Sequence, residues 1–121
     1  MSRTIIAVVD DLFFASKIRG TAEQFSIDVS FARTKEGLIE SALQHKPALI
    51  ICDLHSQRID PIGLAAELKE NHLLRNIPLL GFFSHVQVEL QKAAEAAGFD
   101  RVMPRSAFAR DLPSILAGDF S

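Results

Sequence analysis

The sequence has no tyrosine and no tryptophan, and its single cysteine is Cys52. Because one cysteine cannot form an internal disulfide, a reducing compartment suits the chain, and we expect a cytoplasmic protein. No run of about 18 apolar residues is present, so we expect no segment that spans a membrane. Residues 1–3 lead directly into an apolar run and two aspartates, which is not the pattern of a secretory signal peptide.

A strong charge of either sign is also absent. The 121 residues include 13 Lys and Arg and 15 Asp and Glu, which gives a formal net charge of −2. A near-neutral chain does not bind nucleic acid through electrostatics alone, so we expect no direct nucleic-acid contact. Hydrophobic residues make up 48% of the chain, with only 5 Pro and 6 Gly, which excludes a disordered protein. This size and balance predict a single domain spanning residues 1–121.

Short apolar runs alternate along the chain with longer segments of helical periodicity. The apolar runs predict strands at residues 4–9, 27–31, 49–52, 78–83 and 101–103. Apolar residues at steps of three and four predict helices within residues 14–25, 38–43, 64–68, 86–97 and 108–116. We expect Thr34 to cap the second helix and Ser106 to cap the last. This alternation predicts an α/β fold, with a parallel sheet covered by helices on both faces.

Polar side chains stand where the predicted strands end. Asp10 and Asp11 follow the first strand, and Asp53 follows the third. Ser84 follows the fourth strand, and Arg105 comes shortly after the fifth. Ligands of open parallel sheets bind beyond these ends, so we expect the five side chains to form one site. Taken singly, each has a plainer interpretation as a helix cap, a turn residue or a solvated charge.

The chemistry of these side chains points to phosphoryl transfer. Three neighbouring carboxylates repel one another and need a cation, and oxygen ligands with room for water suit Mg²⁺. A carboxylate beside a metal ion and a fixed cation can hold a phosphoryl group, or attack phosphorus to form an acyl phosphate. His55 and His85 stand nearby in the sequence, so a transition metal is an alternative to Mg²⁺.

The chain resembles the receiver domain of bacterial two-component response regulators over essentially its whole length. The matching motifs are Val-Val-Asp-Asp at residues 8–11, Leu-Ile-Ile-Cys-Asp-Leu at 49–54, Ile-Pro-Leu-Leu-Gly-Phe-Phe-Ser at 77–84 and Ala-Gly-Phe-Asp at 97–100. The resemblance implies a flavodoxin-like (CheY-like) three-layer sandwich, with a five-stranded parallel sheet in the order 2-1-3-4-5 and five flanking helices. It also implies a signalling domain rather than an enzyme, with at most self-catalysed phosphotransfer and dephosphorylation.

The same resemblance assigns roles to the residues at the strand ends. Asp53 matches the aspartate that accepts a phosphoryl group from a histidine kinase or a phosphotransfer protein. Asp10 and Asp11 match the acidic pair that binds Mg²⁺, with Asp53 and the backbone carbonyl of His55 as further ligands. Ser84 matches the residue that follows the phosphoryl group on activation.

The resemblance further implies a face that binds partners. This face comprises the fourth helix, the fifth strand and the fifth helix, here residues 86–97, 101–103 and 108–116. Either a downstream partner protein or a homodimer fits this expectation. The sequence encodes no output domain of its own, so an output domain fused to it in a longer protein is the other expectation.

Several residues near the site depart from the family pattern. Arg105 stands where the family nearly always has lysine, and Ser106 follows it in place of proline. Val102 replaces the switch aromatic, and His85 replaces a small residue. These departures favour an alternative, namely a degenerate receiver that binds partners without being phosphorylated. An enzyme on a similar sheet is a third class, but the sequence lacks the glycine-rich phosphate loops and the Asp-x-Asp-x-Thr motif that such enzymes carry.

Overall fold

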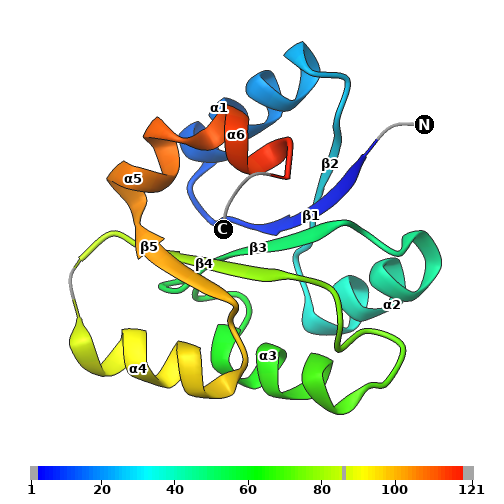
Figure 1. The fold of residues 1–121 in the computed structure, drawn as a ribbon, viewed down its shortest axis with the longest axis vertical. Coiled ribbons are helices and arrows are strands. Elements are labelled where there is room, and N and C mark those ends of the chain that lie inside the picture. The colour runs from blue at the N-terminus through cyan, green and yellow to red at the C-terminus, as the bar shows by residue number, and fades with distance from the viewer. Residues whose placement is uncertain (1–2, 86, 119–121) are drawn as a thin grey trace.

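Five parallel strands form the central sheet of the computed structural model, which describes residues 3–85 and 87–118 (Figure 1). The strands are β1 (Thr4–Val8), β2 (Asp28–Phe31), β3 (Leu49–Asp53), β4 (Leu79–Phe83) and β5 (Arg101–Pro104). Their order is β2-β1-β3-β4-β5, which confirms the expected topology. The central strands β3 and β4 are buried along their whole length, as their continuous apolar runs indicate.

Six helices of the described residues cover the two faces of this sheet, three on each (Figure 1). One face carries α1 (Leu12–Gln24), α5 (Arg105–Arg110) and α6 (Leu112–Leu116). The other carries α2 (Lys35–His45), α3 (Pro61–Glu70) and α4 (Val88–Ala97). Val86, the expected start of the fourth helix, lies outside the described residues. None of the described helices is long and apolar enough to cross a membrane.

The last helical segment accounts for the sixth helix, where five had been expected. It is divided at Asp111 into α5 and α6, and Pro113 lies in the first turn of α6. Proline has no N–H to donate to the preceding turn, so the helix cannot run through this point with its hydrogen bonds intact. The expectation that Ser106 caps this segment is wrong, because α5 begins at Arg105 directly after β5.

The expected cap of α2 is confirmed. The Oγ1 atom of Thr34 accepts a hydrogen bond from the N–H of Gly37 at 3.0 Å, and Thr34 has an extended backbone. This bond satisfies one of the amide groups that have no partner within the first helical turn. A glycine ends α4, since Gly98 is its C-cap and has a φ of 121° that a residue with a side chain rarely adopts.

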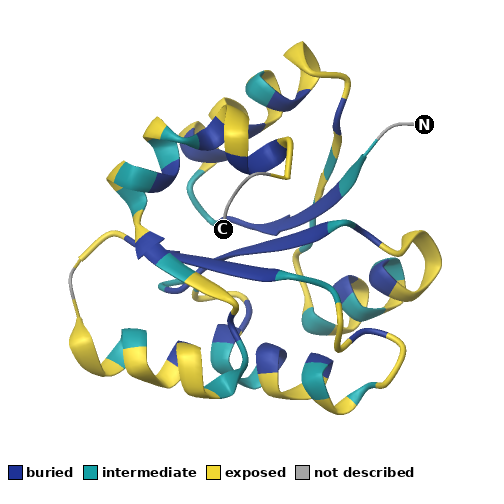
Figure 2. Ribbon diagram, viewed as in Figure 1, coloured by how far each residue is buried: buried dark blue, intermediate teal, exposed yellow. Residues whose placement is uncertain are grey.

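The sheet separates two hydrophobic cores. Alternate residues of β1 point to opposite faces, so Ile5 and Ala7 belong to the core under α1, α5 and α6. Ile6 and Val8 belong to the core under α2, α3 and α4. Figure 2 shows the three inner strands β1, β3 and β4 as largely buried, and the edge strands and the outer faces of the helices as more exposed. This scaffold fixes the carboxyl ends of β1, β3, β4 and β5 along one edge, where the polar side chains stand.

Candidate functional site

Asp53 is a charged residue in the interior of the protein, at the last position of β3. Its exposed fraction is 9%, and its Oδ1 accepts a hydrogen bond from the N–H of His55 at 2.9 Å. Burial raises the pKa of its carboxyl group above the ordinary value, while the N–H of His55 opposes that rise. The charge of Asp10 also raises this pKa, and the charge of Arg105 lowers it.

Asp10 holds the loop that follows β3. Its Oδ1 accepts a hydrogen bond from the Ser56 hydroxyl at 2.9 Å, and its Oδ2 accepts one from the N–H of Gln57 at 2.7 Å. The Ser56 oxygen in turn accepts a bond from the N–H of Ile59 at 3.3 Å. The sequence predicted no role for Ser56 or Gln57. Their contacts with Asp10 join residues 46 and 47 positions apart, and no spacing in the sequence indicates such contacts.

Asp11 is the N-cap of α1, which confirms the plainer of its two interpretations. Its Oδ1 accepts hydrogen bonds from the N–H groups of Phe13 and Phe14 at 2.9 and 3.3 Å. Its Oδ2 accepts a hydrogen bond from Nη2 of Arg105 at 2.8 Å. These bonds lower the pKa of Asp11, and the largest effect comes from Arg105, with the N–H of Phe14 second.

Arg105 therefore contacts the acidic pair through Asp11. Its guanidinium also lies over the ring of Phe14, with Cζ 4.2 Å from the ring centroid. The Phe14 ring packs against Phe82 and Phe108, whose own rings stack at 4.8 Å between centroids. The helical spacing correctly placed Phe14 in the core, but its second role as the surface beneath Arg105 was not predicted.

Ser84 and the two histidines lie on the β3–β4 side of the site. Ser84 directly follows β4, the neighbour of β3 in the sheet, and it is exposed. The rings of His55 and His85 meet edge to face with 5.9 Å between centroids. Nε2 of His55 is buried and has no hydrogen-bond partner among the described residues. A polar pocket of about 410 Å³ adjoins His55 between the loop after β3 and the start of α4.

The carboxylates have the right chemistry for Mg²⁺, but protein donors engage both oxygens of Asp10 and of Asp11 and Oδ1 of Asp53. Asp10 and Asp11 each accept hydrogen bonds through both carboxylate oxygens, and Gln57 approaches the His55 carbonyl at 3.5 Å. In the part of the chain that the structure describes, no three His, Cys, Asp or Glu side chains are grouped so as to hold a metal ion. In this arrangement Arg105 rather than a cation engages Asp11, and the proposed ligand set of Asp10, Asp11, Asp53 and His55 stays a prediction.

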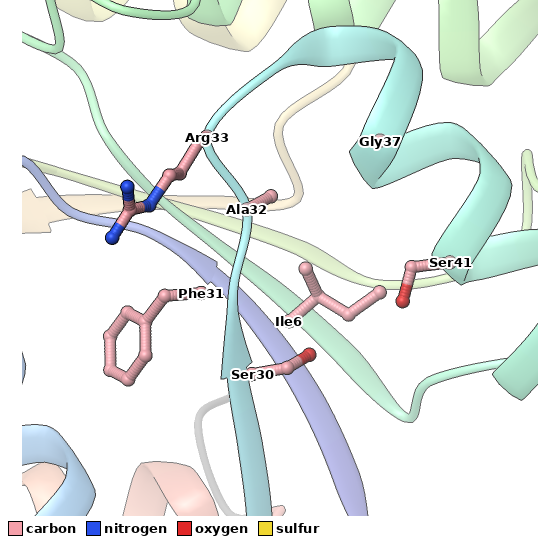
Figure 3. A pocket seen from close by; sticks show the side chains of 7 residues that line it. All are labelled: Ile6, Ser30, Phe31, Ala32, Arg33, Gly37 and Ser41. Carbon is pink, nitrogen blue, oxygen red and sulfur yellow. The ribbon is translucent and has the colours of Figure 1, made fainter.

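A further pocket lies away from these residues, between β2 and α2 (Figure 3). It has a volume of about 220 Å³, and small side chains such as Ser30 and Ser41 line it. The guanidinium of Arg33 extends away from Ser41, so no charge is directed at the centre of the pocket (Figure 3). None of the predicted site residues lines this pocket, and we assign it no role.

The expected partner face presents little apolar surface. Its large apolar side chains in α5 and α6, including Phe108 and Ile115, are fully buried in the core. Among the described residues of this face, the exposed large apolar side chain is Val88. The most exposed large apolar side chains instead belong to Leu12 and Phe13, at 75% and 90%, beside the acidic pair at the start of α1.

Comparison with solved structures identifies the fold. Chemotaxis response regulator CheY4 of Vibrio cholerae superposes with a TM-score of 0.83 at 14% identity, covering 99% of this chain and 100% of that one. The phosphorylated cyanobacterial phytochrome response regulator RcpA gives 0.76 at 19% identity, covering 98% and 91%. The Mn²⁺-bound form of response regulator Rcp1 gives 0.73 at 19% identity, covering 96% and 90%.

These structures show that the chain has the fold of response regulator receiver domains, over nearly its whole length. No family model and no curated protein matches the sequence.

Proposed function

We propose that this chain is a receiver domain of two-component signalling, in which Asp53 accepts a phosphoryl group from a histidine kinase or a phosphotransfer protein. The observation that carries the proposal is the position of Asp53. It is a buried carboxylate at the carboxyl end of a central strand, and Asp10 and Arg105 follow strands that end at the same edge of the sheet. A similarly folded protein, RcpA, has been solved in a phosphorylated form.

The transfer follows from the chemistry of the carboxylate. An oxygen of Asp53 attacks phosphorus, and an acyl phosphate bond forms as the bond from phosphorus to the donor breaks. The electron pair leaves with the donor group, which is an imidazole nitrogen in a phosphohistidine. Arg105 and Ser84 stand at the same edge of the sheet and supply a cation and a hydroxyl for the phosphoryl oxygens.

A divalent cation, Mg²⁺, is part of this proposal. When bound, it balances the negative charge of the carboxylates and the incoming phosphoryl group. As the resemblance implies, Asp10, Asp11, Asp53 and the backbone carbonyl of His55 would hold it once Arg105 has left Asp11. Rcp1, a similarly folded response regulator, has been solved in a Mn²⁺-bound form, which supports divalent cation binding.

Intact mass spectrometry tests the proposed role of Asp53. The protein is incubated with Mg²⁺ and a small acyl phosphate, and we expect a gain of about 80 Da, the mass of one phosphoryl group. Asp53→Asn should show no gain. Asp60→Asn is the matched control and should gain the same mass, because Asp60 only caps α3 and asparagine can replace it there. A wild-type protein that gains no mass contradicts the proposal.

One observation favours the second candidate, a receiver that binds partners without being phosphorylated. Arg105 forms an ion pair with Asp11 and so occupies an oxygen that a metal ion would need. If this pair never opens, the domain acts through its surface alone. The same mass experiment separates the two functions, since this candidate predicts no gain in mass and no effect of Mg²⁺ on the melting temperature.

The output of the domain is proposed to be protein binding in the cytoplasm. Phosphorylation of Asp53 would shift the population of two conformations and so change the affinity of a partner-binding face. That face comprises α4, β5, α5 and α6, and its partner is a downstream protein, a fused output domain or a second copy of the chain. Size-exclusion chromatography with light scattering, before and after treatment with acyl phosphate, measures the molar mass and so tests whether two copies of the chain associate.

A further inference from the structure

We propose that Arg105 is the resident counter-ion of the acidic pair, so that a divalent cation binds only by displacing its guanidinium from Asp11. The inference deepens the proposed function, because it concerns cation binding at the same site. It starts from the contacts described above, in which protein donors engage both oxygens of Asp10 and of Asp11, so that a cation has to compete with them.

Two contacts hold the guanidinium in place. Nη2 of Arg105 donates to Oδ2 of Asp11 at 2.8 Å, and Cζ lies 4.2 Å from the centroid of the Phe14 ring. Both charged side chains are partly buried, with 33% and 40% of their surface exposed. The Phe14 ring is itself fixed by Phe82 and Phe108 in the core. A cation that needs Asp11 therefore competes with a group that is already held on two sides.

The other oxygens of the acidic pair offer no easier entry. Oδ1 of Asp11 caps α1 through the amides of Phe13 and Phe14, so its use by a cation would cost helix stability. Both oxygens of Asp10 hold the loop after β3. Side-chain rotation could release the bonds from Arg105 and from the Ser56 hydroxyl, whereas the other donors are backbone amides. Of these two, the bond from Arg105 is the one on Asp11, and it opposes a cation with a positive charge of its own.

Arginine suits this position in a way that lysine does not. A planar guanidinium can lie flat on the Phe14 ring while an N–H at its edge donates to Asp11. An ammonium group is a compact and strongly hydrated point charge, which keeps the attraction to Asp11 but gives up much of the contact with the ring. Replacing arginine by lysine should thus loosen the counter-ion without removing its charge.

The test is a Mg²⁺ titration without any phosphodonor, followed by the backbone amide NMR signals of Phe13 and Gln57, which report on Asp11 and Asp10. We expect Arg105→Gln to lower the Kd for Mg²⁺ by about threefold or more, and Arg105→Lys to lower it by less. Arg110→Gln is the matched control, because it removes the same charge from the same helix, and the ion pair that it breaks is with Asp111 and not with the acidic pair. Its Kd should match the wild type.

A double variant, Arg105→Gln with Asp11→Asn, tests whether the tighter binding of Mg²⁺ depends on Asp11. We expect its Kd to return to about the wild-type value or above. Equal Kd values for wild type and Arg105→Gln overturn the inference, as does a gain that survives Asp11→Asn or that also appears in Arg110→Gln. If circular dichroism shows that Arg105→Gln is unfolded, the comparison of wild type with Arg105→Lys decides in the same way. A protein that binds Mg²⁺ as expected but gains no mass from acyl phosphate contradicts the proposed function alone.

Discussion

The carboxylate of Asp11 serves two parts of the molecule at once. One oxygen caps the first turn of α1, and the other pairs with Arg105 at the first turn of α5. Both contacts favour the ionised form and lower the pKa of this group. Asp11 therefore contributes stability at neutral pH, and this contribution is lost as the pH falls through its lowered pKa.

Asp53 has the opposite effect on stability. Burial raises its pKa, so the folded protein keeps this proton to higher pH than the unfolded chain does, and stability falls as the pH rises through the folded pKa. Removing the charge with Asp53→Asn should raise the free energy of unfolding at pH 7 by about 1 kcal/mol. Urea unfolding without metal measures this, and the difference from wild type should shrink as the pH falls toward 3.

Asp60→Asn is the control, and its free energy of unfolding should change little because the asparagine keeps the cap of α3. A lower stability of Asp53→Asn at pH 7, or a gain that is undiminished at low pH, would contradict the argument from buried charge.

The residues of the site were predictable in position but only partly in role. Strand ends place Asp10, Asp53 and Arg105 together because parallel strands end at one edge, and the pKa of Asp53 responds to both neighbours. Which carboxylate Arg105 contacts was not predictable, since that depends on the reach of a flexible side chain. The contact between Arg105 and Phe14 depends on three-dimensional packing that no spacing in the sequence encodes.

At the scale of elements, the cap of α2 gives a direct test. Thr34→Ala removes the acceptor for the N–H of Gly37 and should lower the free energy of unfolding by about 1 kcal/mol. Thr34→Ser keeps an oxygen at this position and should cost no more than a few tenths of a kcal/mol. Urea unfolding followed by circular dichroism compares them, and an equal loss in both variants would show that the methyl group, not the hydrogen bond, matters.

The close packing of Gly81 in β4 against Leu54, the residue after β3, gives a second test at this scale. A Cβ atom added at Gly81 would lie 2.8 Å from Cδ2 of the buried Leu54, so Gly81→Ala should cost about 1–3 kcal/mol. Gly20→Ala is the matched change, because nothing lies within 4 Å of its added Cβ. That variant should gain about 0.5–1 kcal/mol, since alanine favours a helix interior. Similar effects of the two substitutions in thermal unfolding would contradict this account.

The boundaries of the elements were harder to predict than their order. Apolar periodicity located the centre of each helix, but α1 begins two residues before its first buried position, with the exposed Leu12 and Phe13. No burial pattern marks such a start, because the cap at Asp11 determines it. Likewise α5 follows β5 without a loop, so the polar signals that normally separate a strand from a helix are missing at Arg105.

At the scale of the whole molecule, Cys52 reports on unfolding. Its thiol is fully buried in β3, and burial raises its pKa to about 12, with the charge of Asp53 adding to the effect. A thiol reagent at pH 8 should therefore leave the native protein unmodified and add one group to each chain in denaturant. Intact mass over time measures this. Rapid modification of the native protein would show that β3 is far more accessible than its burial indicates.

Because the sheet separates the two cores, we expect substitutions in one core to change stability independently of substitutions in the other. The core under α1, α5 and α6 and the core under α2, α3 and α4 have no residue in common. Ile115→Val in the first and Ile59→Val in the second should each cost about 0.5–1.5 kcal/mol, and their sum should match the double variant within about 0.5 kcal/mol. Each face can then accumulate substitutions independently of the other, and the side that carries Arg105 on Phe14 can be redesigned while the opposite layer is left unchanged.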